Sequence, residues 1–371
     1  MACALYRLFL NDQPATTDQL NGFETLTVHQ EMDHNWTAQL EFPLCTNAQG
    51  DWTGESEDWL QPMARVRIEV SLQGNPFVPL IDGSIVTADY DMHMEPGQSI
   101  LRVEVQDDGF LLHRDETIKL YPGLKDDAIA EQIYDDALDI DSTDIDEVAA
   151  PGDLSDHVTV LRGTQMELLQ QLARRQEMHA YVLPGPDPHT SIGCFKYDPD
   201  EDSGLPPMVL LGNKRNLLNI RFSSTSALPA IYTTATISLS DKSQNWRTAN
   251  LDDIQRLGPD APSGTPVHRF LRPGKSWNVD LNNAVLGASE QAAYALNAEG
   301  EVLKDTYPAV LSPYQNVQVN GSNGRLSGLW LIRQVTHTLT RNSYGQTFSL
   351  QRNARSAGMG NVPAPAPPEV F

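Results

Sequence analysis

The sequence has few cysteines and a shortage of basic residues. Its three cysteines, Cys3, Cys45 and Cys194, are scattered over 371 residues with no C-x-x-C spacing. This pattern provides neither a disulfide framework nor a zinc site. Lys and Arg number 26 against 49 Asp and Glu, which gives a formal net charge of −23. This charge argues against a sequence-independent nucleic-acid binder and against docking on an anionic membrane.

Long hydrophobic runs are also absent. No stretch of about 18 apolar residues exists, so we expect no transmembrane helix and no membrane insertion by the chain itself. The first residues, MACALYRLFLNDQ, have Arg7 as their only base, and their apolar run is interrupted, so we expect no signal peptide. Together with the scattered cysteines, these absences favour assembly in the cytoplasm.

The common catalytic signatures G-x-S-x-G, G-x-G-x-x-G, H-E-x-x-H and the Walker loop are missing. We therefore predict no catalytic, cofactor-binding or metal-binding residues, and a protein that is not an enzyme. The segment Asp126–Asp156 has 12 carboxylates and no Lys or Arg. A calcium loop starting at Asp139 would need Gly sixth and Glu twelfth, but Asp144 and Ala150 stand there. We interpret this segment as a solvated acidic face.

The positive signal is β-strand patterning at both ends of the chain. Residues 1–108 and 211–355 hold short alternating runs separated by Gly, Pro and polar residues. Residues 109–210 instead contain helical spacing, with Thr164 and Glu167 forming a capping box. The predicted fold class is α+β, mainly β, with two similar β-domains separated in sequence by a small α/β module. A helix is expected at 289–304, and residues 356–371 form a Pro-rich tail.

Two distant stretches, Leu60–Val105 and Leu311–Asn353, share an order of turn and strand signals. Each begins L-x-P-x-x-x-V-x-(I/V), continues with a Gly that opens a second strand, and ends with Gly-Gln before a third strand. In the first stretch, a register break is expected between Ile100 and Val103. The alternative is that any two meanders share Pro and Gly at their turns. If the repeat is real, a homotrimer would present six similar β-domains, which matches three-fold to six-fold symmetry.

Three single residues each allow two interpretations. His337 is a site residue or a packed residue of a β-meander, and we favour packing. Trp330 is an interface anchor or a core residue, and its apolar neighbours favour the core. His93 is expected at a hairpin tip.

The C-terminal third resembles the baseplate-hub family of contractile phage tails and injection systems, the late-control D-like proteins, and the N-terminal hub part of type VI spike proteins. The similar segments are Ala292–Leu296, Leu311–Val319, Gly328–His337 and Gly345–Leu350. The most specific of them is GLWLIRQVTHTLTRNSYGQTFSLQRN. The middle segments DDGFLLHRDETIKLYPGLKDDAIAEQI and GTQMELLQQLARRQEMHAYV resemble the same family.

This resemblance implies a structural hub with two tube-like β-barrel domains per chain. Such a hub would be a homotrimer that joins the hexameric inner tube to the trimeric central spike by symmetry matching. Its expected partners are the inner tube protein, the spike protein and other baseplate proteins, with no nucleic-acid specificity. It would assemble in the bacterial cytoplasm and become part of the baseplate of a virion or injection particle. Because no β-helix repeat or lysozyme-like segment is visible, spike and wall-degrading enzyme are expected to be separate proteins.

Two alternatives remain open at this point. The first is a wall-active hydrolase or carbohydrate-binding component of the same machine, supported by the richness in carboxylates. The second is a stand-alone ligand-binding β-protein unrelated to tails.

Overall fold

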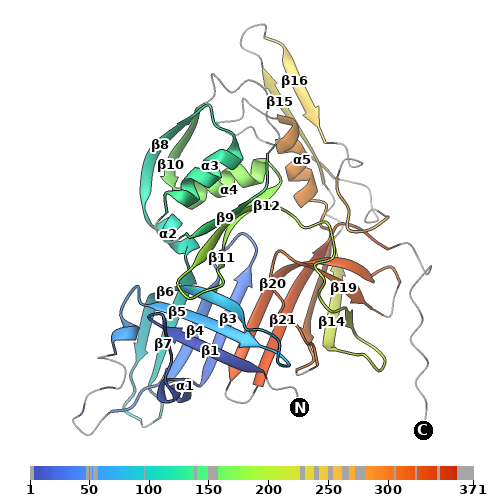
Figure 1. Cartoon of the computed structure of the whole chain (residues 1–371). Coiled ribbons are helices and arrows are strands. Elements are labelled where there is room, and N and C mark those ends of the chain that lie inside the picture. Colours follow the sequence, from blue (N-terminus) through green and yellow to red (C-terminus); the bar gives the residue numbers. More distant parts are fainter. Residues whose placement is uncertain are drawn as a thin grey trace, which may run out of the picture.

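The computed structural model places two β-rich halves side by side, with a third part above the N-terminal half (Figure 1). It describes residues 4–46, 50, 52, 57–95, 97–137, 140–148, 158–225, 230–237, 242–249, 254–260, 267–271, 281–304, 306–321, 324–340 and 343–356. The Pro-rich tail beyond residue 356 lies outside this part of the chain. Among the described residues, no helix has the length and apolar character needed to cross a membrane.

The N-terminal half is almost entirely strand. Its elements are β1 (Leu5–Leu10), β2 (Gln13–Pro14), α1 (Thr17–Gly22), β3 (Thr25–Glu31), β4 (Thr37–Pro43), the 3-10 turn η1 (Asp58–Leu60), β5 (Arg65–Ser71), β6 (Val78–Asp91) and β7 (Ile100–Asp107).

The next segment mixes helices and short strands, as the sequence predicts. Its elements are α2 (Gly109–Arg114), β8 (Glu116–Pro122), α3 (Asp126–Asp135), β9 (Ser142–Ile145), β10 (Val158–Thr164), α4 (Gln165–Arg175), β11 (Met178–Pro184) and β12 (Ser191–Tyr197). The capping box is present: Thr164 Oγ1 accepts from the Glu167 N–H, and the Glu167 carboxylate accepts from the Thr164 N–H. We call the segment from α2 to β12 the α/β module.

The C-terminal half returns to strands. Its elements are β13 (Met208–Val209), β14 (Leu217–Ser224), β15 (Ala230–Ile237), β16 (Gln244–Thr248), β17 (Val267–Phe270), α5 (Leu281–Gln291), β18 (Leu296–Val302), β19 (Asn316–Asn320), β20 (Gly328–Thr340) and β21 (Ser343–Arg352). The mainly β fold class is confirmed.

A single 13-stranded sheet runs through both halves. Its main path is β14-β18-β21-β20-β3-β4-β7-β6-β5-β1-β2, with β19 beside β20 and β13 beside β19. The decisive pair is β3 with β20, which are antiparallel from Gln334 opposite Glu31 to Thr340 opposite Thr25. The module therefore separates the halves in sequence but not in space. Tyr6 of β1 lines a small cavity with Leu26 of β3 and Leu339 of β20. The sheet therefore curls so that β1 approaches β3 and β20.

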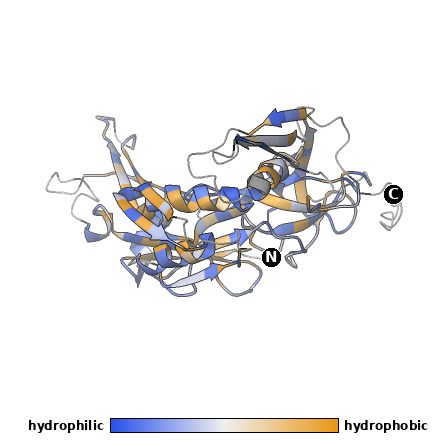
Figure 2. Ribbon diagram, turned by 90° about the horizontal axis from the view of Figure 1, so that it is seen from above, coloured by the Kyte–Doolittle hydropathy of each residue, from blue (hydrophilic) through white to orange (hydrophobic). Residues whose placement is uncertain are grey.

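Alternation of apolar and polar residues explains most of the strands, and Figure 2 shows it along the ribbons. In β7 every second residue is buried, beginning with Leu101 and continuing through Val103 and Val105. The expected register break between Ile100 and Val103 is wrong, because Ile100 simply points to the other face. The irregularity lies in the neighbouring strand β6, at Val86.

Buried apolar side chains gather in three main clusters. One lies in the N-terminal half around Val66, Ile68 and Val103, and one lies in the module around Leu169 and Phe195. The third fills the C-terminal half. Strands β20 and β21 serve two clusters, since Leu339 and Tyr344 pack in the first whereas Trp330 and Phe348 pack in the third. Domain boundaries at residues 108 and 210 stay a prediction.

The expected helix at 289–304 is wrong. The helix α5 ends at Gln291, and residues 296–302 form β18 between β14 and β21. The alanine-rich composition suggested a helix, but pairing on both sides of β18 outweighs this weak propensity. Gly300 fits the strand because a Cβ there would lie 2.5 Å from the Asn219 carbonyl oxygen.

The two stretches predicted to repeat have the same strand arrangement. Strands β5, β6 and β7 form one antiparallel meander, and β19, β20 and β21 form another. Each middle strand carries one extra residue in its pairing with the third strand, Val86 in β6 and Arg333 in β20. The glycines used for the alignment are not equivalent, since Gly83 lies opposite Val66 whereas Gly328 lies opposite Val319.

Candidate functional site

The three parts of the molecule meet at His179, at the start of β11. Its Nδ1 lies 2.6 Å from Asp33 Oδ1 in the turn after β3, and its Nε2 lies 3.1 Å from Asp198 Oδ1 after β12. Tyr314 of the C-terminal half accepts from the Asp33 N–H at 2.7 Å and stacks on Tyr181, with ring centroids 3.6 Å apart. This central junction therefore binds the sheet, the module and the β19 segment to one another.

Charge holds the central junction together. Burial disfavours the charged imidazolium, but the hydrogen bonds and charges of Asp198 and Asp33 outweigh it and raise the pKa of His179 to about 10. Burial also opposes ionisation of Asp33, yet the bond from His179 leaves the pKa of Asp33 below its ordinary value. At neutral pH the junction is thus a cationic histidine between two carboxylates.

Next to this junction lies a cavity of about 320 Å³ with an acidic lining. Its walls include Glu177 just after α4, Glu290 in α5, Asp198 and Tyr294. Burial and a hydrogen bond with Glu177 raise the pKa of Glu290 to about 9, so the two carboxyl groups hold a proton between them at neutral pH. The pair links the module to α5 rather than repelling it.

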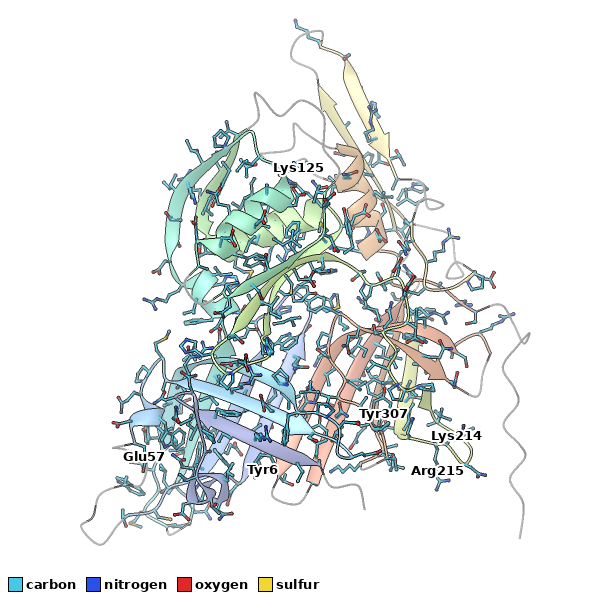
Figure 3. The ribbon with its side chains drawn as sticks, in the orientation of Figure 1. Tyr6, Glu57, Lys125, Lys214, Arg215 and Tyr307 are labelled. Atoms are coloured by element: carbon cyan, nitrogen blue, oxygen red, sulfur yellow. The ribbon has the colours of Figure 1, made fainter. Side chains whose placement is uncertain are left out.

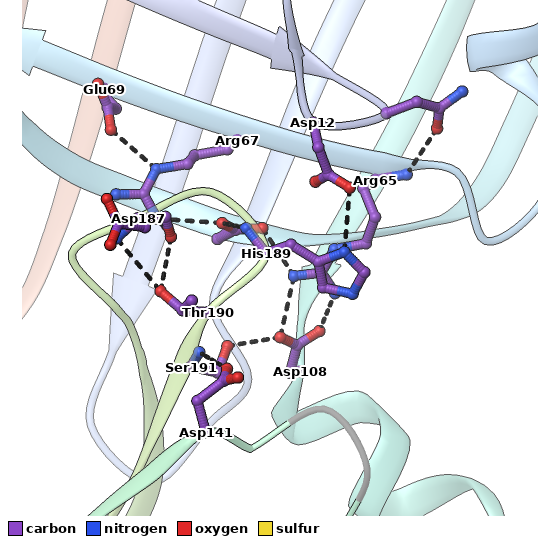
Figure 4. A network of polar contacts seen from close by, with 12 residues as sticks. Asp12, Arg65, Arg67, Glu69, Asp108, Asp141, Asp187, His189, Thr190 and Ser191 are labelled. Atoms are coloured by element: carbon purple, nitrogen blue, oxygen red, sulfur yellow. Dashed lines mark hydrogen bonds and ion pairs between the residues drawn. The ribbon is translucent and has the colours of Figure 1, made fainter.

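A second polar network fixes the β11–β12 hairpin on the sheet (Figure 4). Arg65 and Arg67 project from β5 toward Asp82 of β6, with nitrogen–oxygen distances of 2.7 and 3.0 Å. Arg65 also pairs with Asp108, whose other oxygen accepts from Ser191 Oγ at 2.5 Å. The network thus joins β5, β6, the start of α2 and the start of β12.

Arg67 carries the contact with the hairpin itself. Its guanidinium donates to the carbonyl oxygens of Asp187 at 2.9 Å and Pro186 at 3.0 Å, and its Nε donates to Glu69 at 2.8 Å. The side chain is almost fully buried. Because buried charges are costly when unpaired, loss of this arginine would leave Asp82 and Glu69 without their cation.

A local sequence pattern in β5 indicates this network, although the overall composition of the chain does not. The run RVRIEV in β5 places Arg65, Arg67 and Glu69 on one face of a strand that is buried along its whole length. Alternating opposite charges inside a buried strand indicate an ionic cluster. The central junction carried no such signal, because Asp33, His179 and Asp198 come from distant segments.

The structure confirms the packing predictions for two singled-out residues. His337 is fully buried, with Nδ1 2.8 Å from the Tyr344 hydroxyl and Nε2 3.1 Å from Gln30 Oε1, and burial lowers its pKa to about 3. Trp330 is a core residue whose Nε1 donates to the Leu326 carbonyl at 3.0 Å. His93 lies in the exposed turn between β6 and β7, as expected.

The acidic segment is only partly a solvated face. Asp126 is buried at the start of α3 and pairs with Arg175 of α4, while Gln176 donates to it at 2.6 Å. The solvated interpretation is therefore wrong for this residue. The position Asp139 lies outside the described residues. Within the described part of the chain, no group of three or more His, Cys, Asp or Glu has an arrangement that could hold a metal ion.

An exposed apolar face lies on the two-stranded ribbon of β8 and β10. Ile118, Leu120, Val158 and Val160 point outward there, while Tyr121 and Leu161 on the other face pack into the module. Contiguous exposed apolar side chains are typical of contact surfaces.

Comparison with known proteins gives structural matches. No family model and no curated protein sequence matches the chain. A tail protein from Neisseria meningitidis aligns with 94% of this chain and 97% of its own, with a TM-score of 0.59 and 11% identity. The 43 kDa tail protein of prophage MuSo2 from Shewanella oneidensis aligns with 95% and 99%, with a TM-score of 0.60 and 12% identity.

The chain shares the fold of these two tail proteins. A component of the Escherichia coli type VI secretion system has this fold too, covering 93% of this chain and 77% of its own with a TM-score of 0.55 and 10% identity. That protein is described as structurally similar to the bacteriophage T4 tail proteins gp27 and gp5. The expected likeness to tail and injection-system proteins is therefore confirmed for the fold.

Proposed function

We propose that this chain is a structural component of a phage tail or contractile injection system, and specifically a baseplate hub that acts as a homotrimer. One observation carries the proposal: the β3–β20 pairing brings two equivalent meanders into one sheet, with β3 and β4 between them. Three copies would then present six similar β-rich units on one side and three-fold symmetry on the other. The tail-protein fold supports the same proposal.

The function of such a hub is mechanical. It would join the hexameric inner tube to the trimeric spike and contact other baseplate proteins around it. The buried networks at Arg67 and His179 suit this role, because they fix the module on the sheet through charged hydrogen bonds. Assembly in the bacterial cytoplasm, before incorporation into the baseplate of a virion or injection particle, belongs to this proposal.

Light scattering of the purified chain tests the proposal. The expected result is a species of three 41.0 kDa chains, alone or after addition of the expected spike partner. Binding to the expected inner tube protein, measured by co-sedimentation, is the second expected result. A chain that remains a monomer with both proteins present would overturn the hub proposal.

The hydrolase alternative has one specific observation, the carboxyl pair in the acidic cavity. Glu177 and Glu290 lie within hydrogen-bond reach of each other. Two-carboxylate glycosidases keep their carboxyl groups at least about 5 Å apart. We therefore expect no clearing of peptidoglycan suspensions by the purified chain. Clearing that disappears in Glu290→Gln would favour the alternative.

A further inference from the structure

We propose that copies of this chain join head to tail by pairing the open end of β6 in one copy with β14 of the next. The strand register between the two copies would be the same as the register between β20 and β3 within one chain. The inference rests on the proposed hub for the number of copies, but the junction itself follows from the strand pairings of a single chain.

The first step is the equivalence of β6 and β20. Val66 lies opposite Gly83, and its repeat partner Val317 lies opposite Trp330. This correspondence also superimposes the two extra residues, Val86 and Arg333. A loop contact supports it, because the Ile85 N–H donates to the Ala64 carbonyl as the Ile332 N–H donates to the Gln315 carbonyl.

The second step is the equivalence of β3 and β14. Ala38 of β4 lies opposite Val105 of β7, and Ala298 of β18 lies opposite Leu350 of β21. One strand further out, Val28 of β3 lies opposite Ala38, and Phe222 of β14 lies opposite Ala298. Strand β14 therefore occupies in the C-terminal half the place that β3 occupies in the N-terminal half.

The two halves differ in what covers the end of the middle strand. In β20, residues 334–340 pair with β3. In β6, the equivalent residues 87–91 pair with β7 on one side and with no described strand on the other. Strand β14 likewise pairs with β18 alone among the described strands. Among the described strands, each copy thus has two edges without a partner strand, the end of β6 (the acceptor edge) and β14 (the donor edge). Open edges are templates for strand addition.

Applying the β20–β3 register to β6 of one copy and β14 of the next predicts specific residue pairs. His337 faces Val28 within the chain, so Tyr90 would face Phe222 of the next copy. Thr338 faces Thr27, so Asp91 would face Arg221, and Leu339 faces Leu26, so Met92 would face Ile220.

The side chains in these three pairs are chemically complementary, although the pairs were chosen from the β20–β3 register alone. Two pairs are apolar and one joins opposite charges, the combinations that stabilise antiparallel neighbours. In the C-terminal half the equivalent positions His337 and Leu339 are 0% and 4% exposed. Their counterparts Tyr90 and Met92 are 39% and 48% exposed in the single chain. Arg221 is exposed, and no ion pair of it is found in the described part of the structure.

The donor and acceptor edges are different surfaces, so the contact is heterologous. Such contacts generate a closed ring when the rotation closes and a filament when it does not. A ring would repeat the same type of junction alternately within and between chains.

Disulfide trapping tests the junction. In a chain with Cys3→Ser and Cys45→Ser, the double variant Asp91→Cys/Arg221→Cys should form covalent dimers and trimers under mild oxidation, because directly opposite Cβ atoms lie about 5 Å apart. The matched control Asp91→Cys/Asn219→Cys shifts the register by two residues on the same face and should cross-link roughly tenfold more slowly. Each single variant should give at most dimers.

The outcomes separate the junction from the hub. A native trimer in which the matched pair cross-links no faster than the shifted pair would overturn the junction and leave the hub standing. Rapid cross-linking into an open-ended ladder would support the junction and overturn the trimer. A chain that is monomeric under all conditions, including with tube and spike proteins, would overturn both.

Charge reversal provides an independent test in the native chain. Arg221→Asp places two carboxylates opposite each other and should weaken assembly roughly fivefold per junction. Asp91→Arg should do the same, and the double reversal should restore assembly. The control is Arg215→Asp in the exposed loop before β14, at the lower right of Figure 3, which should assemble normally. Failure of the double reversal to restore assembly, with both single variants folded, would contradict the pairing.

Discussion

At the scale of single residues, ionisable groups do much of the joining. His179, Arg67 and Asp126 each connect segments that are far apart in the sequence. Buried charges of this kind are destabilising when one partner is removed, and they fix one arrangement of the parts. Their titration therefore predicts how stability depends on pH.

The first prediction concerns His179. Its pKa of about 10 lies above the ordinary value of 6.5, so its contribution to stability is complete below pH 6.5 and is lost as pH rises through 10. We expect His179→Gln to lower the free energy of unfolding by about 3 kcal/mol at pH 6 and to reduce this pH dependence. Urea unfolding at pH 6, 8 and 10 measures both. His93→Gln, at an exposed ion pair, should change stability by less than about 1 kcal/mol.

A second prediction concerns the shared proton of Glu290 and Glu177. A carboxyl group whose pKa is raised from 4.5 to about 9 stabilises the fold fully below pH 4.5 and loses that effect as pH rises through 9. Glu290→Gln keeps a hydrogen-bond donor and carries no charge. As pH rises from 5 to 9, the free energy of unfolding of the variant should therefore increase relative to that of the parent chain. Parallel curves for the two proteins over this range would contradict the shared proton.

At the scale of elements, local pattern predicted most strands and the best helix. The alternation in β7 and the capping box at Thr164 are signals within a few residues of sequence. The helix prediction for residues 289–304 was wrong because the structure of this region depends on contacts with distant segments. Residues 296–302 become a strand because β14 and β21 pair with them, and Ser289 sits inside α5, bonding the Val285 carbonyl at 2.9 Å instead of capping a helix.

The candidate sites show the same limit. Trp330 lies in an apolar run and His337 lies in a strand with alternating residues, and these local patterns are enough to predict that both are packed. Neither the pairing of β3 with β20 nor the meeting of Asp33 with Asp198 through His179 leaves a local pattern. Such contacts follow from the whole topology, and short sequence windows do not contain it.

A third prediction tests how the hairpin of β11 and β12 is held. Arg67→Ala should destabilise the protein by roughly 3–5 kcal/mol, because Asp82 and Glu69 would remain buried without a cation. The loop at residues 185–190 should then become the first site of proteolysis. Arg102→Ala removes a half-exposed pair with Glu41 and should cost less than about 1 kcal/mol. Equal losses for the two variants would mean that the network adds little.

At the scale of the whole molecule, two β-rich halves share their strands. The strand β20 contributes Leu339 to the N-terminal core and Trp330 to the C-terminal core. It also pairs with β21 along most of its length and with β3 near its end. Neither half is therefore complete without the other.

The fourth prediction follows from this sharing. Thr336→Pro removes a main-chain donor from β20 and strains the ladder between β3 and β21, at a cost of about 3 kcal/mol or more. Hydrogen exchange should accelerate together in β4, which belongs to one half, and in β18, which belongs to the other. Faster exchange confined to a single half would show that the halves open independently.

The late arrival of β20 also matters while the chain is being made. His29 and Thr336, which contact each other across the joint, are 307 positions apart. At a synthesis rate of about 5 to 20 residues per second, the edge of β3 waits roughly 15 to 60 s on the ribosome before its own partner emerges. During that time it is an unprotected template beside identical nascent chains. The cell must therefore keep neighbouring copies apart until each has closed this joint internally, and only afterwards let them meet.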